Sequence, residues 1–329
     1  MNVVMIIPTG IGCEIGGHAG DATPAARLLA ACCDKLVLHP NVVNASDINE
    51  MPENALYVEG SMLDRFLEGA IQLEEVKQNR ILVAVNDPVH NETINAVSAA
   101  RATLGIDASI VVLKTPLKLV GKFDEKGRAT GDVYGWEELV QQVWQYDFDA
   151  LAVATFINVP KEVALYYYRN GGTNPWGGVE AKASKLICEK LNLPVAHAPI
   201  ENSDPEVSTF NEIVDPRISA EAVSLCYLHC VLKGLHKAPR IGEGLIAADI
   251  DCLVTPVGCV GRPHEACMEA GIPVIAVKEN TTCLNEEMPD DWTSVENYWE
   301  AAGLLMAMNA GIHPASVRRP LKLTEVMNA

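Results

Sequence analysis

Two glycine-rich segments have the composition of loops that bind anions. The first, residues 8–24 (PTGIGCEIGGHAGDATP), follows the apolar run Val3–Ile7. Glycines let backbone amides approach a ligand closely, and a helix that starts behind them favours a bound anion at its N-terminus. The alternative is that the glycines only form a tight turn. The residues predicted here to bind a ligand are Gly10, Gly12, Gly17 and His18, with Asp21 as a candidate acid or base.

The second segment, residues 171–181 (GGTNPWGGVEA), combines a helix start with two glycines. Asn174 can cap the helix and bind a ligand, but Gly177 and Gly178 in its first turn cost about 1 kcal/mol each relative to alanine. We infer that the missing Cβ atoms leave room for a carboxylate or phosphate at the unpaired amides. A packing contact that needs small residues is the alternative. Glu180, one turn further on, is a candidate general base if burial raises its pKa.

Histidines and amides accompany other predicted strands. His39 comes directly after an apolar run, and His197 lies within another, PVAHAP. Histidine at the end of a strand is suited to acid/base catalysis, although a ring that hydrogen-bonds to backbone fits the pattern equally well. The polar residues that follow His39, as candidates for ligand binding or for capping a short helix, are Asn41, Asn44, Ser46 and Asp47.

Two further loops lie towards the C-terminal end of the sequence. Gly258 and Gly261 precede a predicted helix that contains His264. Glu279 and Asn280 follow the next predicted strand. Ligands of open α/β sheets bind where loops leave the carboxyl ends of the strands. We therefore add these two glycines, the glutamate and the asparagine to the predicted ligand-binding residues.

The ten cysteines are too few for a disulfide scaffold and form no CxxC pair, which predicts thiols in a reducing cytoplasm. Cys13 and Cys259 would face a substrate from two sides in a thiol-based racemase, but a free cysteine is usually an inert small apolar residue. Cys226, His229 and Cys230 have helical spacing, and their apolar neighbours favour core packing over a metal site. We predict no metal site, and the residues identify no cofactor.

Short apolar runs rich in Val, Ile and Leu alternate with helix-period stretches and would position these side chains. The runs lack polar alternation, as expected of a parallel sheet that is covered on both faces. The fold class is therefore α/β, mainly a parallel sheet with helices on both faces, and residues 117–134 predict a mid-chain β-hairpin. We place a boundary between two lobes, residues 1–147 and 148–329, with a single domain as the alternative. The runs are Val3–Ile7, Lys35–Leu38, Ile81–Val85, Ser109–Leu113, Ala150–Ala154, Cys252–Thr255 and Val274–Val277, and the helical stretches are Thr23–Cys33, Glu92–Leu104, Gly178–Leu191, Ala220–Leu235, Pro263–Ala270 and Val295–Asn309.

The charge balance excludes several classes of partner. The 329 residues include 25 Lys and Arg but 43 Asp and Glu, which gives a net charge of −18. Such a surface repels nucleic acids and anionic membranes. The N-terminus lacks the features of a secretory signal, and no stretch approaches the roughly 20 apolar residues of a membrane span. We expect a cytoplasmic protein whose partner is a small molecule, and a homo-oligomer is compatible with the sequence.

Seven segments between residues 6 and 282 form a specific combination: residues 8–24, HPNVVNASD, YVEGS, GGVEA, PVAHAP, GLHKAP and VKENTT. In these segments the chain resembles an uncharacterised bacterial, notably cyanobacterial, family that carries only a domain-of-unknown-function label. The resemblance implies that the loops form one shared pocket, implies no reaction, and does not require cysteine at position 13. The matching residues are Gly10, Gly12, Gly17, Asp21, His39, Asn41, Asn44, Gly177, Gly178, Glu180, His197, Glu279 and Asn280.

These residues suggest two classes of function. The first is an enzyme that transfers a proton on a carboxylated or phosphorylated metabolite, as an isomerase, racemase or lyase, with His39, Glu180 and His197 as acid/base groups. The second is a metabolite or nucleotide sensor without catalysis. A nicotinamide-dependent dehydrogenase ranks third because the GxGxxG spacing is absent. We expect the loops around His39, Glu180 and Asn280 to converge on one cleft, and Gly178→Ala to weaken ligand binding without destabilising the fold.

Overall fold

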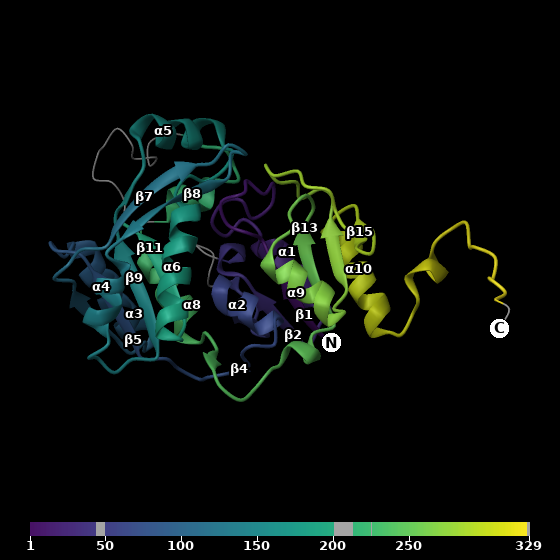
Figure 1. Cartoon of the computed structure of the whole chain (residues 1–329), viewed down its shortest axis with the longest axis horizontal. Coiled ribbons are helices and arrows are strands. Elements are labelled where there is room, and N and C mark those ends of the chain that lie inside the picture. The colour runs from purple at the N-terminus through teal and green to yellow at the C-terminus, as the bar shows by residue number, and fades with distance from the viewer. Residues whose placement is uncertain (44–49, 201–212, 225, 328–329) are drawn as a thin grey trace.

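The computed structural model of the protein describes residues 1–43, 50–200, 213–224 and 226–327 (Figure 1). Asn44, Ser46 and Asp47 therefore lie outside the described residues. Two large parallel sheets, with helices packed on both faces, make up most of the structure. The predicted α/β fold class is confirmed.

Sheet A has six parallel strands in the order β15-β14-β13-β1-β2-β3. Alternate residues of β1 point to opposite faces of the sheet. Val3 and Met5 join the core beneath α1 (Thr23–Ala30) and α10 (Tyr298–Asn309), while Val4 joins the core beneath α2 (Gly60–Leu67) and α9 (Arg262–Ala270). Apolar residues at every position thus follow from burial on both faces. The strands of sheet A are β1 (Asn2–Met5), β2 (Lys35–Leu38), β3 (Ala55–Tyr57), β13 (Cys252–Pro256), β14 (Val274–Val277) and β15 (Thr293–Val295).

Sheet C has four parallel strands in the order β11-β9-β5-β6, and α3 and α8 cover one face while α4 and α6 cover the other. In the view of Figure 1 it lies on the left of the molecule and sheet A on the right. Its strands are β5 (Ile81–Val85), β6 (Ala108–Val112), β9 (Ala150–Thr155) and β11 (Val195–Pro199). The helices are α1 (Thr23–Ala30), α2 (Gly60–Leu67), α3 (Asn91–Leu104), α4 (Trp136–Val143), α5 (Lys161–Asn170), α6 (Gly177–Leu191), α7 (Ser219–Val223), α8 (Tyr227–His236), α9 (Arg262–Ala270) and α10 (Tyr298–Asn309).

The predicted hairpin is present as the antiparallel pair β7 (Lys118–Phe123) and β8 (Ala129–Tyr134), which turns at Gly127 with φ 78°. A short strand, β10 (Ile157–Asn158), pairs parallel with β7. Helix α6 packs directly against both hairpin strands. The hairpin therefore supports the helix on which several candidate residues lie.

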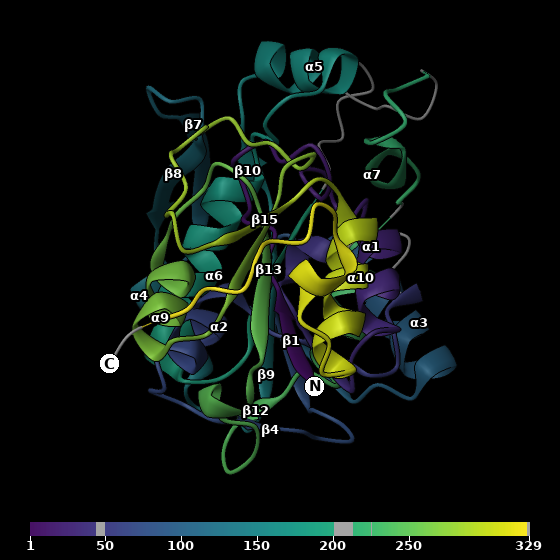
Figure 2. The same ribbon diagram turned by 90° about the vertical axis from the view of Figure 1, so that its right-hand side faces the viewer.

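The sheets do not divide at residue 147. Sheet A combines strands from both ends of the chain, because β1 pairs with β13 in the register Val3↔Cys252 (Figure 2). Sheet C takes two strands from before residue 147 and two from after it. Two short strands, β4 (Leu73–Glu74) and β12 (Arg240–Ile241), pair antiparallel where the chain passes between the two sheets. How the chain divides into domains stays a prediction, but the two predicted lobes share both large sheets.

Within the part of the chain that the structure describes, no helix is both long and apolar enough to cross a lipid bilayer.

Candidate functional site

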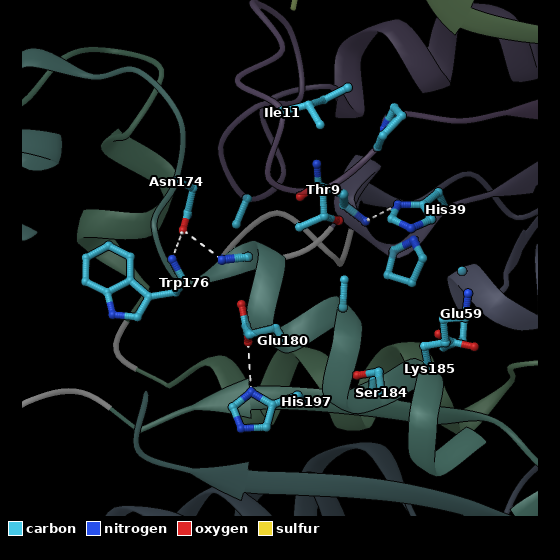
Figure 3. A pocket seen from close by; sticks show the side chains of 18 of the residues that line it. Thr9, Ile11, His39, Glu59, Asn174, Trp176, Glu180, Ser184, Lys185 and His197 are labelled. Atoms are coloured by element: carbon cyan, nitrogen blue, oxygen red, sulfur yellow. Dashed lines mark hydrogen bonds and ion pairs between the residues drawn. The ribbon is translucent and has the colours of Figure 1, made fainter. Parts of the chain in front are cut away.

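A cavity of about 590 Å³ lies where the loops after sheet A meet helix α6 and strand β11 (Figure 3). We call it the central cavity. This volume is in the range of pockets that hold small molecules. Its lining includes eight of the predicted site residues, namely Gly17, His39, Asn41, Asn174, Gly177, Glu180, His197 and Gly261. Residues far apart in the sequence thus border one space, as expected at the carboxyl edge of parallel strands.

Helix α6 forms one wall of the central cavity. Gly177, Glu180, Ala181, Ser184 and Lys185 all line it. Because residues three and four apart share a helix face, this spacing turns a single stripe of α6 towards the cavity. Figure 3 shows the Glu180 and Ser184 side chains projecting from the helix.

Glu180 is the exposed end of a buried hydrogen-bond chain. His197 Nδ1 lies 2.9 Å from Glu180 Oε1, and His197 Nε2 lies 2.8 Å from Thr155 Oγ1. The His197 side chain is only 1% exposed, whereas that of Glu180 is 22% exposed. Because a carboxylate can only accept, the ring donates through Nδ1 and its Nε2 accepts from the threonine hydroxyl. Glu180 is therefore the member of the chain that can contact a ligand directly, and the buried His197 ring orients the Glu180 carboxylate.

A buried carboxyl group, that of Glu221, also lines the central cavity, and it is not among the residues predicted from the sequence. It accepts hydrogen bonds from the backbone amide of Ala19 at 2.6 Å, from Asn174 Nδ2 at 3.0 Å and from the Tyr167 hydroxyl at 3.1 Å. Burial raises the pKa of Glu221 to about 7. The available signal was a single acid in the otherwise small and apolar stretch SAEAV, which resembles an ordinary helix face.

The two glycines at the start of α6 are explained by packing. A Cβ atom on Gly178 would lie 2.0 Å from the carbonyl oxygen of Ala129 in β8, and one on Gly177 would lie 2.6 Å from Thr9 Cγ2. The first amides of the helix, those of Trp176 and Gly177, already donate to Asn174 Oδ1 at 2.9 and 3.2 Å. This corrects our expectation that Gly178 is free to become alanine. The packing alternative explains why glycine stands at position 178. The two amides that we expected to bind an anion donate their hydrogen bonds to Asn174 instead.

Most glycines in the loop after β1 are explained by the backbone conformation and close packing of that loop. Gly10 and Gly12 have positive φ angles of 77° and 59°, which glycine adopts without strain. A Cβ atom on Gly10 would lie 3.1 Å from Gly178 Cα, and one on Gly17 would lie 2.0 Å from the Cys13 carbonyl oxygen. Of these glycines, Gly17 lines the central cavity, so the tight-turn alternative explains most of the set.

The titratable residues of this loop lie apart from the hydrogen-bond chain of Glu180. His18 is buried, its Nδ1 lies 2.6 Å from the Tyr167 hydroxyl, and burial lowers its pKa to about 4. Asp21 borders a separate shallow hollow beside Arg217, and burial raises its pKa to about 7. Asp21 is therefore not part of the described lining of the central cavity.

His39 and Asn41 line the central cavity in different roles. The His39 Nδ1 atom accepts from the Asn41 amide at 3.3 Å, and burial lowers the pKa of His39 to about 4. A neutral ring can still bind a polar ligand. The Asn41 side chain donates to the Gly16 carbonyl at 2.6 Å and so holds the glycine-rich loop in place.

Asn280 lies outside the central cavity, which corrects the expected convergence of three loops. It is fully buried, accepts from the Ile15 amide at 2.9 Å, and donates to the Ile15 carbonyl and the Tyr298 hydroxyl, both at 2.8 Å. Its neighbour Glu279 accepts from the Tyr298 amide at 3.1 Å and borders the hollow near Asp21. Both residues hold the loop after β1 and the start of α10 rather than a ligand in the cavity.

Asn280→Ala is therefore expected to destabilise the fold. The substitution removes the three hydrogen bonds of a fully buried side chain and leaves the Ile15 amide without its partner, which we expect to cost about 2 to 3 kcal/mol. Urea denaturation of both proteins measures the difference. Asn170→Ala is the matched control, because the Asn170 side chain donates to a helix carbonyl at an exposed position. Equal midpoints for the two variants would contradict the structural role of Asn280.

The two remaining candidates, Gly258 and Gly261, lie in backbone turns. Gly258 has a φ of 77° and packs against Asn285, and the Gly261 amide donates to His264 Nδ1 at 3.1 Å at the start of α9. Gly261 lines the central cavity, whereas Gly258 is not part of its described lining.

The cysteines do not form the thiol pair that we considered. Cys259 lines the cavity, but burial raises its pKa to about 11, and burial raises the pKa of Cys13 well above its usual range. His264 bonds to Thr255 Oγ1 at 2.8 Å and not to Cys259. Both thiols stay protonated at neutral pH and are poor nucleophiles or bases. Among the described residues, no three His, Cys, Asp or Glu side chains are placed to hold a metal ion together.

Comparison with known proteins places the chain in a family. A curated protein of Synechococcus sp., named an uncharacterized lipoprotein, is 36% identical over 337 residues, covering 95% of this chain and 92% of that protein. A solved structure of ornithine carbamoyltransferase from Gloeobacter violaceus aligns with 77% of this chain and 94% of its own at 16% identity, but its TM-score of 0.15 carries no structural information. The family model described as "Protein of unknown function (DUF3326)" matches residues 2–318. The predicted resemblance is confirmed, and the chain belongs to this family.

Proposed function

We propose that the protein is an enzyme that transfers a proton on a small metabolite bound in the central cavity, with Glu180 as the general base. The observation that supports this most directly is the chain from Glu180 through His197 to Thr155, which ends in a half-buried carboxyl group at the cavity wall. A carboxylate that borders a cavity and is oriented by a second group is an arrangement suited to a general base.

The hydrogen bonds of Glu180, His197 and Thr155 indicate the role of each side chain. His197 holds one oxygen of Glu180, and among the described residues the other oxygen is left to receive a proton from carbon. Thr155 donates to the far nitrogen of the ring and fixes the tautomer that donates to Glu180. Isomerases, racemases and lyases share this first step, so the proposal covers these three reaction types.

We further propose that the substrate carries a carboxylate or phosphate. Three cationic side chains, those of Arg128, Lys161 and Lys185, line the cavity. Arginine and lysine are the usual partners of such groups. These side chains replace the helix amides as the support for an acidic substrate, because Asn174 occupies those amides.

A nucleotide sensor is the second candidate, and an aromatic wall favours it. Tyr168 and Trp176 line the cavity with ring centroids 5.4 Å apart and planes inclined by 37°. Flat rings of this kind can stack on a nucleobase. A sensor would use this wall and would not need the hydrogen-bond chain of Glu180.

We also propose a cytoplasmic location, which the ten free cysteines support because reduced thiols persist there. The Synechococcus relative is named a lipoprotein. Fractionation of cells that produce this chain, followed by detection in membrane and soluble fractions, tests the location directly.

A screen for C–H exchange of small metabolites in D₂O tests the proposed activity. The protein is incubated in D₂O with a mixture of amino acids, 2-oxo acids, 2-hydroxy acids and sugar phosphates, and proton NMR follows the loss of each C–H signal. We expect at least one carboxylated or phosphorylated compound to exchange at a rate proportional to protein concentration. If no compound exchanges and native mass spectrometry of the purified protein finds a bound nucleotide, the sensor replaces the enzyme.

A further inference from the structure

We propose that Glu221 is a second catalytic group of the central cavity, the acid that protonates the substrate oxygen while Glu180 removes a proton from carbon. This inference rests on the proposed function above and assigns a role to a residue outside the sequence predictions. It depends on where Glu221 lies, on which of its oxygens is available, and on the groups that surround it.

The position of Glu221 is tied to that of Glu180 through Asn174. The Asn174 side chain donates to Glu221 Oε1 and accepts from the amides of Trp176 and Gly177, which begin α6. Glu180 follows Gly177 by three residues, or about 5 Å along the helix axis. Both carboxyl groups line the central cavity, the space in which we propose that the substrate binds.

The two oxygens of Glu221 have different partners. Oε1 accepts hydrogen bonds from the Ala19 amide, from the Asn174 side chain and, at 3.3 Å, from the Tyr167 hydroxyl. Among the described residues, Oε2 accepts one hydrogen bond, from the Tyr167 hydroxyl at 3.1 Å. A carboxylate oxygen has room for two donors. Oε2 is therefore the oxygen that can carry a proton and hand it to a ligand.

The surroundings of Glu221 allow it to hold a proton at neutral pH. The titratable groups around it are Tyr167 of α5, His18 and Asp21 of the loop after β1, and Tyr227 of α8, whose hydroxyl donates to the Glu221 carbonyl. Burial raises the pKa of Glu221 to about 7, while the bonds from Ala19, Tyr167 and Asn174 lower it. A carboxyl group of this kind can both give and regain a proton near pH 7.

The step balances in protons and electrons. The Glu180 carboxylate takes H⁺ from a carbon next to a carbonyl, and the C–H electron pair becomes the new C=C bond. The π electrons of the carbonyl move to its oxygen, which takes H⁺ from the Glu221 carboxylic acid and forms a neutral enol. The resulting Glu221 carboxylate is stabilised by the Tyr167 hydroxyl, and reversal of both transfers at another carbon or face gives the isomer.

Glu221→Gln tests the role of the acid. With a compound that the D₂O screen identifies, we expect the rate of net conversion to fall about 100- to 10,000-fold, as for loss of a general acid. The wild-type rate should decline above pH about 7 as Glu221 loses its proton, and this decline should be absent from the residual activity of Glu221→Gln. Glu300→Gln is the matched control, because that carboxylate also accepts a backbone amide, that of Glu296, but lies on α10 outside the described cavity lining.

Tyr167→Phe is the second variant, and it tests the proposal even if Glu221→Gln does not fold. The Tyr167 bond favours the charged form of Glu221, so its loss should raise the pKa of Glu221 and move the alkaline decline in rate to higher pH. Two outcomes would overturn the role of Glu221 without contradicting the proposed function. One is a Glu221→Gln enzyme that keeps the alkaline decline and a rate within about 2-fold of wild type, and the other is a decline that does not move in Tyr167→Phe. Absence of exchange in the wild type overturns the proposed function and this inference together.

Discussion

Glu180→Gln is expected to slow proton transfer strongly while leaving the fold and the cavity intact. Glutamine has nearly the same shape, and its amide oxygen can still accept from His197 Nδ1, so the buried chain to Thr155 remains satisfied. The amide cannot take a proton from carbon. We expect the C–H exchange of the compounds found in D₂O to fall about 100- to 10,000-fold, the usual contribution of a general base.

The control for this prediction lies on the same helix. Glu189→Gln makes the same chemical change at a surface position of α6, where the carboxylate lies 3.4 Å from an Arg262 nitrogen and is 38% exposed. Exposed ion pairs contribute little to stability, so exchange and melting temperature should stay near the wild-type values. If Glu180→Gln exchanges as fast as Glu189→Gln, then Glu180 is not the base.

Gly178→Ala is expected to destabilise the protein by about 3 kcal/mol or more, at the upper end of the cost of overpacking. The new methyl group would lie 2.0 Å from the Ala129 carbonyl oxygen and 2.7 Å from the Thr130 amide nitrogen. Both atoms are backbone of β8 and cannot rotate away. Either α6 or the hairpin must move, and α6 carries Glu180.

Gly303→Ala separates this packing effect from helix propensity. Gly303 lies in α10, and a Cβ atom there would meet nothing within 4 Å. Alanine should therefore stabilise the protein by up to about 1 kcal/mol. Urea denaturation of both variants should give midpoints on opposite sides of the wild type. A Gly178→Ala midpoint at or above that of the wild type would show that α6 does not pack on the hairpin as described.

The architecture was predictable where the signal is local. Uninterrupted apolar runs indicated buried parallel strands, and alternation around a glycine turn indicated the hairpin, which is present as β7 and β8. The order of strands was not predictable, because nothing in β1 specifies β13 as its neighbour. The sequence predicts one helix over Ala220–Leu235, whereas α7 ends at Val223 and α8 begins at Tyr227. Both parts are apolar, so periodicity alone did not reveal the interruption.

The sequence predicted those residues of the candidate site that lie next to the ends of predicted strands and helices. His39 and Glu180 were identified because they accompany predicted strand and helix ends, and both line the central cavity. Asn280 follows a strand just as His39 does, yet its side chain turns into the protein to bind Ile15. Glu221 escaped notice because its partners come from three other segments, and hydrogen bonds across such distances in sequence leave no pattern along the chain.

The place of β1 in the middle of sheet A has a consequence for synthesis on the ribosome. Its neighbour β2 is made at once, but the residue that pairs with Val3 on the other side is Cys252, which emerges 249 residues later. At about 5 to 20 residues per second, the apolar edge of β1 waits roughly 10 to 50 s for its partner. Sheet C, whose strands all lie between these two residues, can assemble during that interval. The nascent chain therefore exposes an unpaired strand edge, a typical target of chaperones, until its last quarter is translated.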